Sequence, residues 1–163
     1  MPTLIQLKSP RDCSKEKIDA FIRLAEEGGE VDPHGLPGRV ARAAFLAFLH
    51  EENRLIGVGA LKNQSPDYVK DVFASAGCEG AHLQFRWELG WVSVARDHWE
   101  KGHSKTIVGA LLVPAQGAAI YATSNTGRIA MHRTLEKLGF IRRGGDWASK
   151  QHRGERLYLF VRQ

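Results

Sequence analysis

The sequence predicts an α/β protein that forms a single domain over residues 1–163, with a mixed β-sheet flanked by helices. Apolar runs typical of strands alternate with helical patterns, which excludes an all-helical bundle. A buried strand over 84–95 leads through a short loop into a helix over 105–113, and such crossovers imply parallel pairing of the later strands. The length of 163 residues, 43% of them hydrophobic, is enough for one sizeable core.

The N-terminal elements begin with a helix. Ser14 before an apolar helical pattern predicts a start at Ser14, and Gly28-Gly29 predicts the end. The segment 30–39 is rich in Pro and Gly, so we expect a surface loop without regular structure. Apolar runs over 43–50 and 55–61, separated by polar residues, predict a β-hairpin.

The later elements follow in the order helix, strand, helix, strand, helix, strand. Ser65 followed by Pro66 predicts a short helix. In the strand 84–95, alternation puts Phe85, Trp87, Leu89 and Trp91 on one face and Arg86, Glu88, Gly90, Val92 and Val94 on the other. After the helix 105–113 we expect a strand over 118–123, a helix over 128–138 and a last strand over 157–161. Gly139 suits the left-handed residue that ends a helix, and Phe140 begins the next apolar segment.

The loop between the strand 84–95 and the following helix predicts an anion-binding site. A strand that opens into a helix points free backbone N–H groups and the positive end of the helix dipole at one place, which favours phosphate. Here the groups are the N–H groups of 101–105. The loop has neither the three-glycine dinucleotide pattern nor the Gly-Lys-Ser/Thr of a P-loop, so another phosphate-bearing ligand is indicated.

These residues resemble the GNAT superfamily of acyl-CoA N-acyltransferases. Its pyrophosphate loop is written Arg/Gln-x-x-Gly-x-Gly/Ala, preceded by a valine, and it is matched here by Val94, Gly102 and Ser104, whereas Trp99 replaces the Arg/Gln. A second segment, 119–140, is similar to the family's fifth strand and fourth helix. The resemblance covers 44–162 and implies a sheet splayed between the fourth and fifth strands, with acetyl-CoA as co-substrate.

The resemblance also implies which residues contact the cofactor. It implies that backbone groups at the end of the strand receive the pantetheine arm, and that the loop N–H groups hold the pyrophosphate. Asn125 stands near the start of the family's fourth helix, where it caps that helix or contacts pantetheine, and Arg128 occupies a position where the family commonly has asparagine. The cofactor-binding candidates are Val92, Val94, Lys101, Gly102, His103, Ser104, Lys105, Asn125 and Arg128.

Three catalytic roles follow from the chemistry of thioester aminolysis. Glu88 matches a position where many family members have a general base, and burial in an apolar strand would raise its pKa towards useful values; its other reading is a structural carboxylate. The backbone N–H of Val94 is the candidate oxyanion donor. The family's acidic tyrosine falls on Leu135, so either Tyr121 or Ser124 replaces it or the thiolate leaves without direct protonation.

Several functions remain open for this chain. The main prediction is an N-acetyltransferase acting on a primary amine of a small molecule or peptide. Trp99 and Leu135 also fit an acyl-CoA-binding sensor or partner module with weak catalysis. The net charge of +5 and pI of 9.4 suit a polyphosphate ligand, but they also suit an acyltransferase acting on aminoacyl-tRNA, which we rank lower.

The remaining features are less specific. An imidazolium at His98 or His103 would suit phosphate. No histidines have metal-ligand spacing, so no metal is expected. Cys13 and Cys78 form no disulfide pattern. The sequence lacks a long apolar span or an N-terminal basic region before an apolar core, so we expect a cytoplasmic protein without a membrane partner, and we keep a homodimer among its assemblies.

Overall fold

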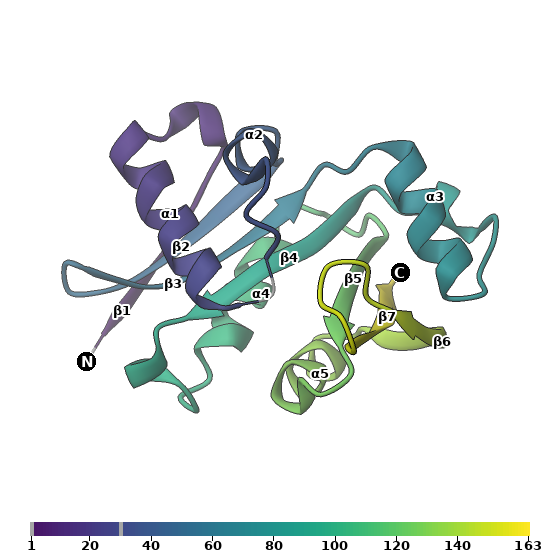
Figure 1. Ribbon diagram of the computed structural model, residues 1–163. Coiled ribbons are helices and arrows are strands. Elements are labelled where there is room, and N and C mark those ends of the chain that lie inside the picture. The colour runs from purple at the N-terminus through teal and green to yellow at the C-terminus, as the bar shows by residue number, and fades with distance from the viewer. Residues whose placement is uncertain (1, 30) are drawn as a thin grey trace. The chain divides into compact units, whose positions relative to one another are not determined.

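A computed structural model describes residues 2–29 and 31–163. The helices are α1 (Lys15–Glu27), α2 (Leu36–Ala41), α3 (Pro66–Ser75), α4 (His103–Leu112) and α5 (Ile129–Lys137), with short 3₁₀ turns at Pro10–Asp12, Ala81–Gln84 and Arg96–His98. The strands are β1 (Thr3–Lys8), β2 (Phe45–Glu51), β3 (Arg54–Lys62), β4 (Trp87–Val94), β5 (Ile120–Asn125), β6 (Ile141–Ala148) and β7 (Arg156–Arg162). Figure 1 shows these elements in order along the chain.

The strands are hydrogen-bonded in the order β1-β2-β3-β4-β5-β7-β6. β2 is antiparallel to both β1 and β3, and β7 is antiparallel to both β5 and β6. β4 is parallel to β5, with Trp87 opposite Ile120 and Glu88 opposite Tyr121. This mixed sheet with flanking helices confirms the predicted α/β class.

The chain forms two compact units. Unit 1 comprises the described residues up to Lys62 together with Leu89–Pro114, and unit 2 comprises Asn63–Glu88 and Ala115–Gln163. The boundary falls inside β4, whose first two residues belong to unit 2. That the whole of residues 1–163 behaves as one domain stays a prediction.

In unit 1, α1 and α4 cover opposite faces of the sheet (Figure 1). The Phe21 ring of α1 lies 5.6 Å from that of Phe48. On the other face, a Cβ atom at Gly57 would lie only 2.7 Å from Ile107 of α4, so the glycine allows the close approach of this helix. As predicted, Ser14 caps α1, because its side chain accepts a hydrogen bond from the Lys17 N–H.

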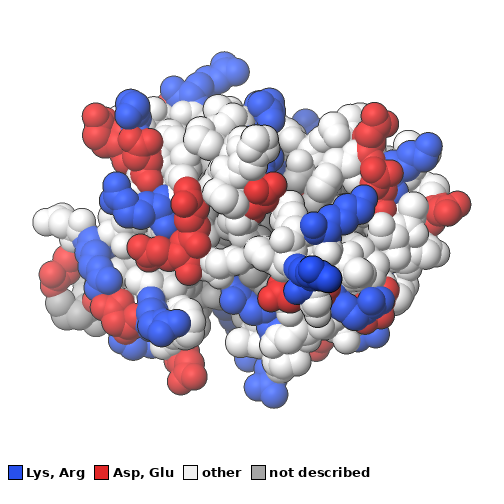
Figure 2. All heavy atoms as spheres, in the orientation of Figure 1, with Lys and Arg blue, Asp and Glu red and all other residues white. Residues whose placement is uncertain are grey.

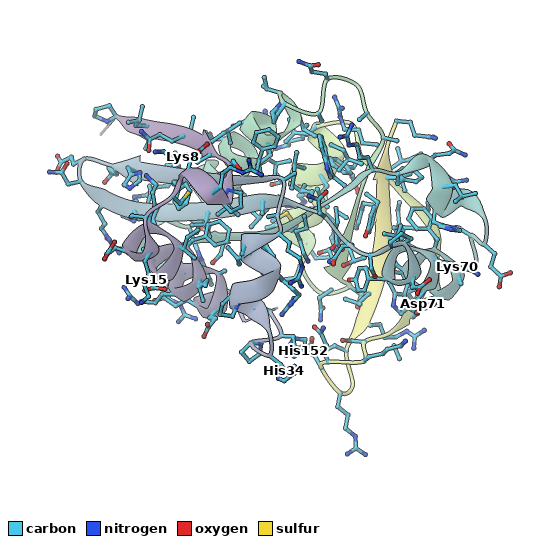
Figure 3. All side chains as sticks on the ribbon, turned by 90° about the horizontal axis from the view of Figure 1, so that it is seen from above. Lys8, Lys15, His34, Lys70, Asp71 and His152 are labelled. Carbon is cyan, nitrogen blue, oxygen red and sulfur yellow. The ribbon has the colours of Figure 1, made fainter. Side chains whose placement is uncertain are left out.

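In unit 2, α3 and α5 also pack on opposite faces. The side chains that form the core under α3 are Val69, Val72, Phe73, Phe85, Tyr121, Leu159 and Val161. On the α5 face, the His132 ring lies 5.1 Å from Phe160, which is next to Leu159 on β7 and therefore points the other way. Lys70 and Asp71 lie on the exposed side of α3 (Figure 3). Unit 2 is thus a sheet covered on both faces.

The end of α5 confirms the role predicted for Gly139. This residue has a φ of 93°, in the left-handed region. The Phe140 N–H donates to Leu135 O at 3.0 Å and the Gly139 N–H donates to Glu136 O at 3.1 Å, which is the Schellman pattern. Phe140 is then buried at the start of β6. The local sequence therefore fixes both the end of the helix and the direction of the chain.

Two N-terminal expectations need correction. The segment 30–39 contains the start of α2, although we expected no regular structure, and Glu30 lies outside the described residues. Pro37 is tolerated because it lies in the first turn, where its missing N–H needs no partner, and the buried Leu36 and Val40 anchor the helix. The strand β1 was not predicted from the sequence.

The strand predicted over 84–95 begins later, at Trp87, because Ala81–Gln84 forms a 3₁₀ turn. Its alternation is also interrupted. Trp91 has a φ of 53°, an uncommon left-handed conformation for a bulky residue within a strand. Beyond it, Ser93 is buried and its hydroxyl donates to Leu24 O of α1 at 2.9 Å. The Trp91 ring lies 6.2 Å from that of Phe21, so Trp91 and Ser93 both face α1.

Candidate functional site

The loop between β4 and α4 contains the predicted anion site (Figure 1). Gly102 is the N-cap residue of α4 and has a φ of 79°, and nothing lies within 4 Å of where its Cβ atom would be. No side chain caps the helix, and its first turn contains no acidic residue. The N–H groups of the first turn therefore have no side-chain cap, and the positive end of the helix lies at Gly102. This arrangement has the geometry predicted for an anion cradle.

The side chains around Gly102 suit a polyphosphate ligand. Lys101 and Lys105 are exposed, and Ser104 is half-buried within the first turn of α4. His103, the first residue of the helix, has a buried Nε2 atom without a hydrogen-bond partner among the described residues. A ligand oxygen would satisfy that atom. The residues present thus fit the diphosphate of CoA.

Trp99, where the family pattern has Arg or Gln, closes the loop back onto β4. Its indole N–H donates to Val94 O at 2.7 Å, while its side chain remains exposed. The Val94 carbonyl therefore already has one partner within the protein. Val92 projects towards α4, since a Cβ atom at Gly59 would lie 3.4 Å from its Cγ2 atom.

His98 belongs to an ion-pair network, and this network takes both its ring nitrogens. Nδ1 lies 3.0 Å from Asp97, and Nε2 lies 3.1 Å from Glu51. Arg54 extends the network through two contacts with Asp97, at 2.7 and 3.1 Å. The hydrogen bonds to Asp97 and then to Glu51 raise the pKa of His98. The suggestion that His98 pairs with phosphate is therefore replaced by a structural role beside the loop.

In unit 2, Glu88 lies buried beside polar groups. Its side chain is 2% exposed and accepts a hydrogen bond from Gln64 Nε2 at 2.7 Å. Because Glu88 is opposite Tyr121 on the parallel strand β5, the two side chains project to the same face of the sheet. Gln64, just before α3, was not identified from the sequence, and only its contact with Glu88 reveals it.

Tyr121 and Ser124 are the two hydroxyl candidates on β5. Both are buried, and neither hydroxyl has a hydrogen-bond partner among the described residues. Burial, followed by the charge of Glu88, raises the pKa of Tyr121, so its phenol stays protonated. The two residues are three positions apart on a strand and therefore point to opposite faces. Tyr121 shares its face with Glu88, whereas Ser124 does not.

Asn125 shapes the start of α5. Its side-chain Oδ1 accepts a hydrogen bond from the Gly127 N–H at 2.8 Å, and its backbone oxygen accepts from the Arg128 N–H and from His132 Nε2. Asn125 therefore forms a local turn before α5 and does not cap the helix, whose N-cap residue is Arg128, while its contact with pantetheine stays a prediction. Arg128 is the N-cap residue of α5 without a side-chain capping bond.

Leu135 is buried, with 1% of its side chain exposed. It lies on the stripe of α5 that also buries His132. The leucine in place of the family's tyrosine therefore forms part of the core of unit 2.

The predicted site residues thus fall into two groups. Unit 1 contains Val92, Val94 and the loop 101–105, and unit 2 contains Glu88, Tyr121, Asn125 and Arg128. Among the described residues, no group of three or more His, Cys, Asp or Glu side chains could hold a metal ion. Both cysteines are free thiols. None of the helices that the structure describes is long and apolar enough to cross a bilayer.

Comparisons with known proteins extend over the full length of the fold. No protein-family model matches the sequence, and no curated protein matches it. Among solved structures, Escherichia coli ElaA superposes with a TM-score of 0.74 at 12% identity, covering 99% of this chain and 100% of that chain. An acyl-CoA N-acyltransferase from Pseudomonas aeruginosa gives 0.73 at 12% identity, with the same coverage.

A third structure was solved with acetyl-CoA. It is yncA, a putative acetyltransferase from Salmonella typhimurium, with a TM-score of 0.69 at 14% identity, covering 100% of this chain and 94% of that chain. A putative acetyltransferase of the GNAT family from Desulfovibrio desulfuricans gives 0.67 at 14% identity, covering 98% of each chain. Together with the strand order and the cradle at Gly102, these similarities show that the chain has the fold of the GNAT acyltransferases.

Proposed function

We propose that this protein is an acetyl-CoA-dependent N-acetyltransferase that transfers an acetyl group to a primary amine of a small molecule or peptide. The observation that supports this most directly is the uncapped N-terminus of α4 behind the left-handed Gly102. The GNAT fold and the neighbour solved with acetyl-CoA support the same reading. The N–H groups of 101–105 would hold the diphosphate, and His103 Nε2 would donate to one of its oxygens.

Acetyl-CoA, when bound, supplies an activated acetyl thioester. Asn125 and Arg128, at the start of α5, remain proposed contacts of the pantetheine arm. Val92 and Val94 would contribute backbone groups at the end of β4.

Glu88 is the proposed general base. Direct attack requires a neutral amine. The carboxylate must therefore take a proton from the ammonium form before the attack, or from the amine nitrogen as it attacks. Gln64 donates to Glu88 and orients the carboxylate. Burial in an apolar environment strengthens such a contact.

The spacing along β4 constrains the role of Val94. It lies six positions after Glu88, which would be about 20 Å along a regular extended strand. One thioester carbonyl cannot contact the Val94 N–H while the attacking amine contacts Glu88. If Glu88 is the base, the Val94 N–H binds the pantetheine arm, and the carbonyl is held nearer Trp91, which has a left-handed conformation. If instead Val94 is the oxyanion donor, Glu88 is structural.

Tyr121 is the proposed proton donor to the departing thiolate, if one is needed. Its phenol is protonated, has no hydrogen-bond partner among residues 2–29 and 31–163, and lies on the same face as Glu88. A thiolate with a conjugate-acid pKa of about 8.5 can also leave near neutral pH without direct protonation. We therefore expect Tyr121 to assist turnover and not to be essential.

The decisive test is CoA binding by the wild-type protein and by Gly102→Glu. Ligand at about 100 times its dissociation constant stabilises a fold by about 2.7 kcal/mol, so CoA should raise the melting temperature of the wild type. Gly102→Glu should stay folded, because space is open around the Cβ position, but it should lose the CoA shift. Gly77→Glu is a matched control, with a φ of 78° and open space in unit 2. No shift for the wild type at millimolar CoA would refute the proposal.

Two alternatives have a specific observation behind them. The buried Leu135 and the substituted Trp99 fit an acyl-CoA sensor with weak catalysis, and measurable thiol release with an amine panel would exclude it. Residues 128–163 contain nine Lys and Arg but only three Asp and Glu, which fits an acyltransferase acting on aminoacyl-tRNA. Figure 2 shows several of these blue side chains where Figure 1 draws β5 to β7. Salt-sensitive RNA binding would support this second alternative.

A further inference from the structure

The turn that leads into the cradle at Gly102 is fixed to the β2–β3 hairpin by charged side chains. Glu51 is the last residue of β2 and Arg54 is the first residue of β3, so both lie at the tip of this hairpin. Glu51 lies 3.1 Å from His98, and Arg54 makes two contacts with Asp97, at 2.7 and 3.1 Å. The tip of the hairpin is thus joined to the segment that comes immediately before the cradle.

The backbone between His98 and α4 has a conformation that needs such support. Glu100 has a φ of 63° and Gly102 has a φ of 79°, both in the left-handed region. A residue other than glycine pays a cost in free energy there and keeps this conformation only where the surrounding structure imposes it. The helix holds one end of this segment, while Trp99 and His98 hold the other. The shape of the cradle therefore depends on how firmly His98 is held.

The network around His98 adds little net charge to the cradle. When His98 is protonated, its charge and that of Arg54 cancel those of Glu51 and Asp97. Removing either carboxylate would leave a net positive charge, which by itself would strengthen the binding of an anion. A loss of positioning would weaken it. The two effects have opposite signs for these carboxylates, so affinity measurements can tell them apart.

We propose that Glu51 and Arg54 are positioning residues for the phosphate cradle, acting through His98 and Asp97 to hold the loop in the conformation that binds the diphosphate of CoA. This inference rests on the proposed function and adds a control of cofactor affinity by residues outside the loop. The affinity for CoA is then set partly by a hairpin that ends more than 40 residues before the cradle.

The protonation of His98 decides how many of these contacts form. The charged and titratable groups around its ring are Asp97, Glu51, Arg54, Lys101 and His103. An imidazolium donates from both nitrogens and so to both carboxylates, whereas a neutral imidazole donates from only one. The hydrogen bonds to Asp97 and then to Glu51 raise the pKa of His98 above 6.5. The contribution of the network to CoA affinity should therefore be complete below pH 6.5 and fall as the pH rises through the folded-state pKa.

The test is titration calorimetry with CoA. We expect Glu51→Ala to bind CoA at least about fivefold more weakly than the wild type, at the lower end of typical coupling between sites. Glu51→Gln should retain most of the affinity, because its amide oxygen still accepts a hydrogen bond from His98. Asp97→Ala, at an exposed position, should weaken CoA binding in the same way and decides the question if Glu51→Ala does not fold. Asp146→Ala is the matched control, since it removes an exposed carboxylate that pairs with an arginine in unit 2.

A pH series on His98→Gln separates positioning from a merely structural role. The glutamine amide cannot donate to both carboxylates in the geometry of an imidazolium, so it stands in for the neutral imidazole. The wild type should bind CoA more tightly than His98→Gln below pH 6.5, and this advantage should disappear as the pH rises through the folded-state pKa. Comparing the two proteins at each pH cancels the ionisation of CoA itself. An advantage that does not change with pH would overturn the inference.

The outcomes also separate this inference from the proposed function. If the wild type binds CoA and Glu51→Ala binds it equally well or more tightly, the network acts only through charge or on stability. The positioning inference is then wrong and the proposed function stands. If the wild type does not bind CoA, the proposed function fails and the inference falls with it.

Discussion

Replacing Leu135 with tyrosine, the family's residue at this position, decides between two explanations of the leucine. Either the position faces the ligand and the proton donor was lost, or the position belongs to the core. Leu135 is 1% exposed, and its carbonyl accepts the Phe140 N–H that ends α5. A tyrosine here would overpack the core, at a cost of about 1–3 kcal/mol. If its buried hydroxyl found no partner, a further cost of about 1–3 kcal/mol would follow.

These costs convert into a measurable change in melting temperature. For a chain of 150–250 residues, each kcal/mol shifts the melting temperature by about 2–4 °C. We therefore expect Leu135→Tyr to melt about 10 °C below the wild type in thermal unfolding followed by circular dichroism. Leu135→Phe separates overpacking from the unpaired hydroxyl. Ile129→Tyr, at a position on the same helix that is 53% exposed, should change stability by less than about 0.5 kcal/mol.

Thiol release measured on the same proteins completes the test. We expect Leu135→Tyr to turn over no faster than the wild type, because a side chain in the core cannot reach the leaving thiolate. A variant that melts like the wild type and turns over faster would refute the reasoning. It would show that the position faces the ligand and that the wild-type enzyme lacks an acid there.

Two further predictions concern titratable groups. Glu88→Gln should lower kcat much more than it weakens CoA binding and should remove or move the acidic limb of the pH–rate profile, whereas an unchanged profile would show that Glu88 is structural. The raised pKa of His98 means that its ion pairs stabilise the fold fully below pH 6.5, and that this contribution is lost as the pH rises through the folded-state pKa. Hydrogen bonds from Arg54 first and then from His98 lower the pKa of Asp97. Its contribution to the stability of the fold is therefore present above pH 3.8 and is lost as the pH falls through the folded-state pKa. Urea unfolding of the wild type and His98→Gln across pH 4–9 should therefore show their largest difference between pH 4 and 6.5, and a difference independent of pH would contradict the network.

The candidate cradle was predictable from local sequence, because it depends on one strand end, one loop and one helix start. Gly139 has the left-handed conformation that its position suggested, and Gly102 has a left-handed conformation as well. Ser14 and Ser65 cap their helices as expected, since a cap needs only a hydroxyl three residues before an N–H. The pairing of Glu88 with Gln64 was not predictable, because it joins residues 24 positions apart.

The sequence by itself determined most of the elements of this protein and the residue types of the loop before α4, although β1 and α2 were missed. These properties depend on hydrophobic periodicity, capping residues and glycine conformation, which act over a few neighbouring residues. Only the tertiary structure decided the roles of individual side chains. The burial of Leu135 shows that it belongs to the core. The contact with Glu51 places His98 in an ion-pair network, and the hydrogen bond to the Val94 carbonyl places the Trp99 indole at the end of β4. A side chain's role depends on the partners that folding brings to it, and a single sequence carries no direct record of those long-range contacts.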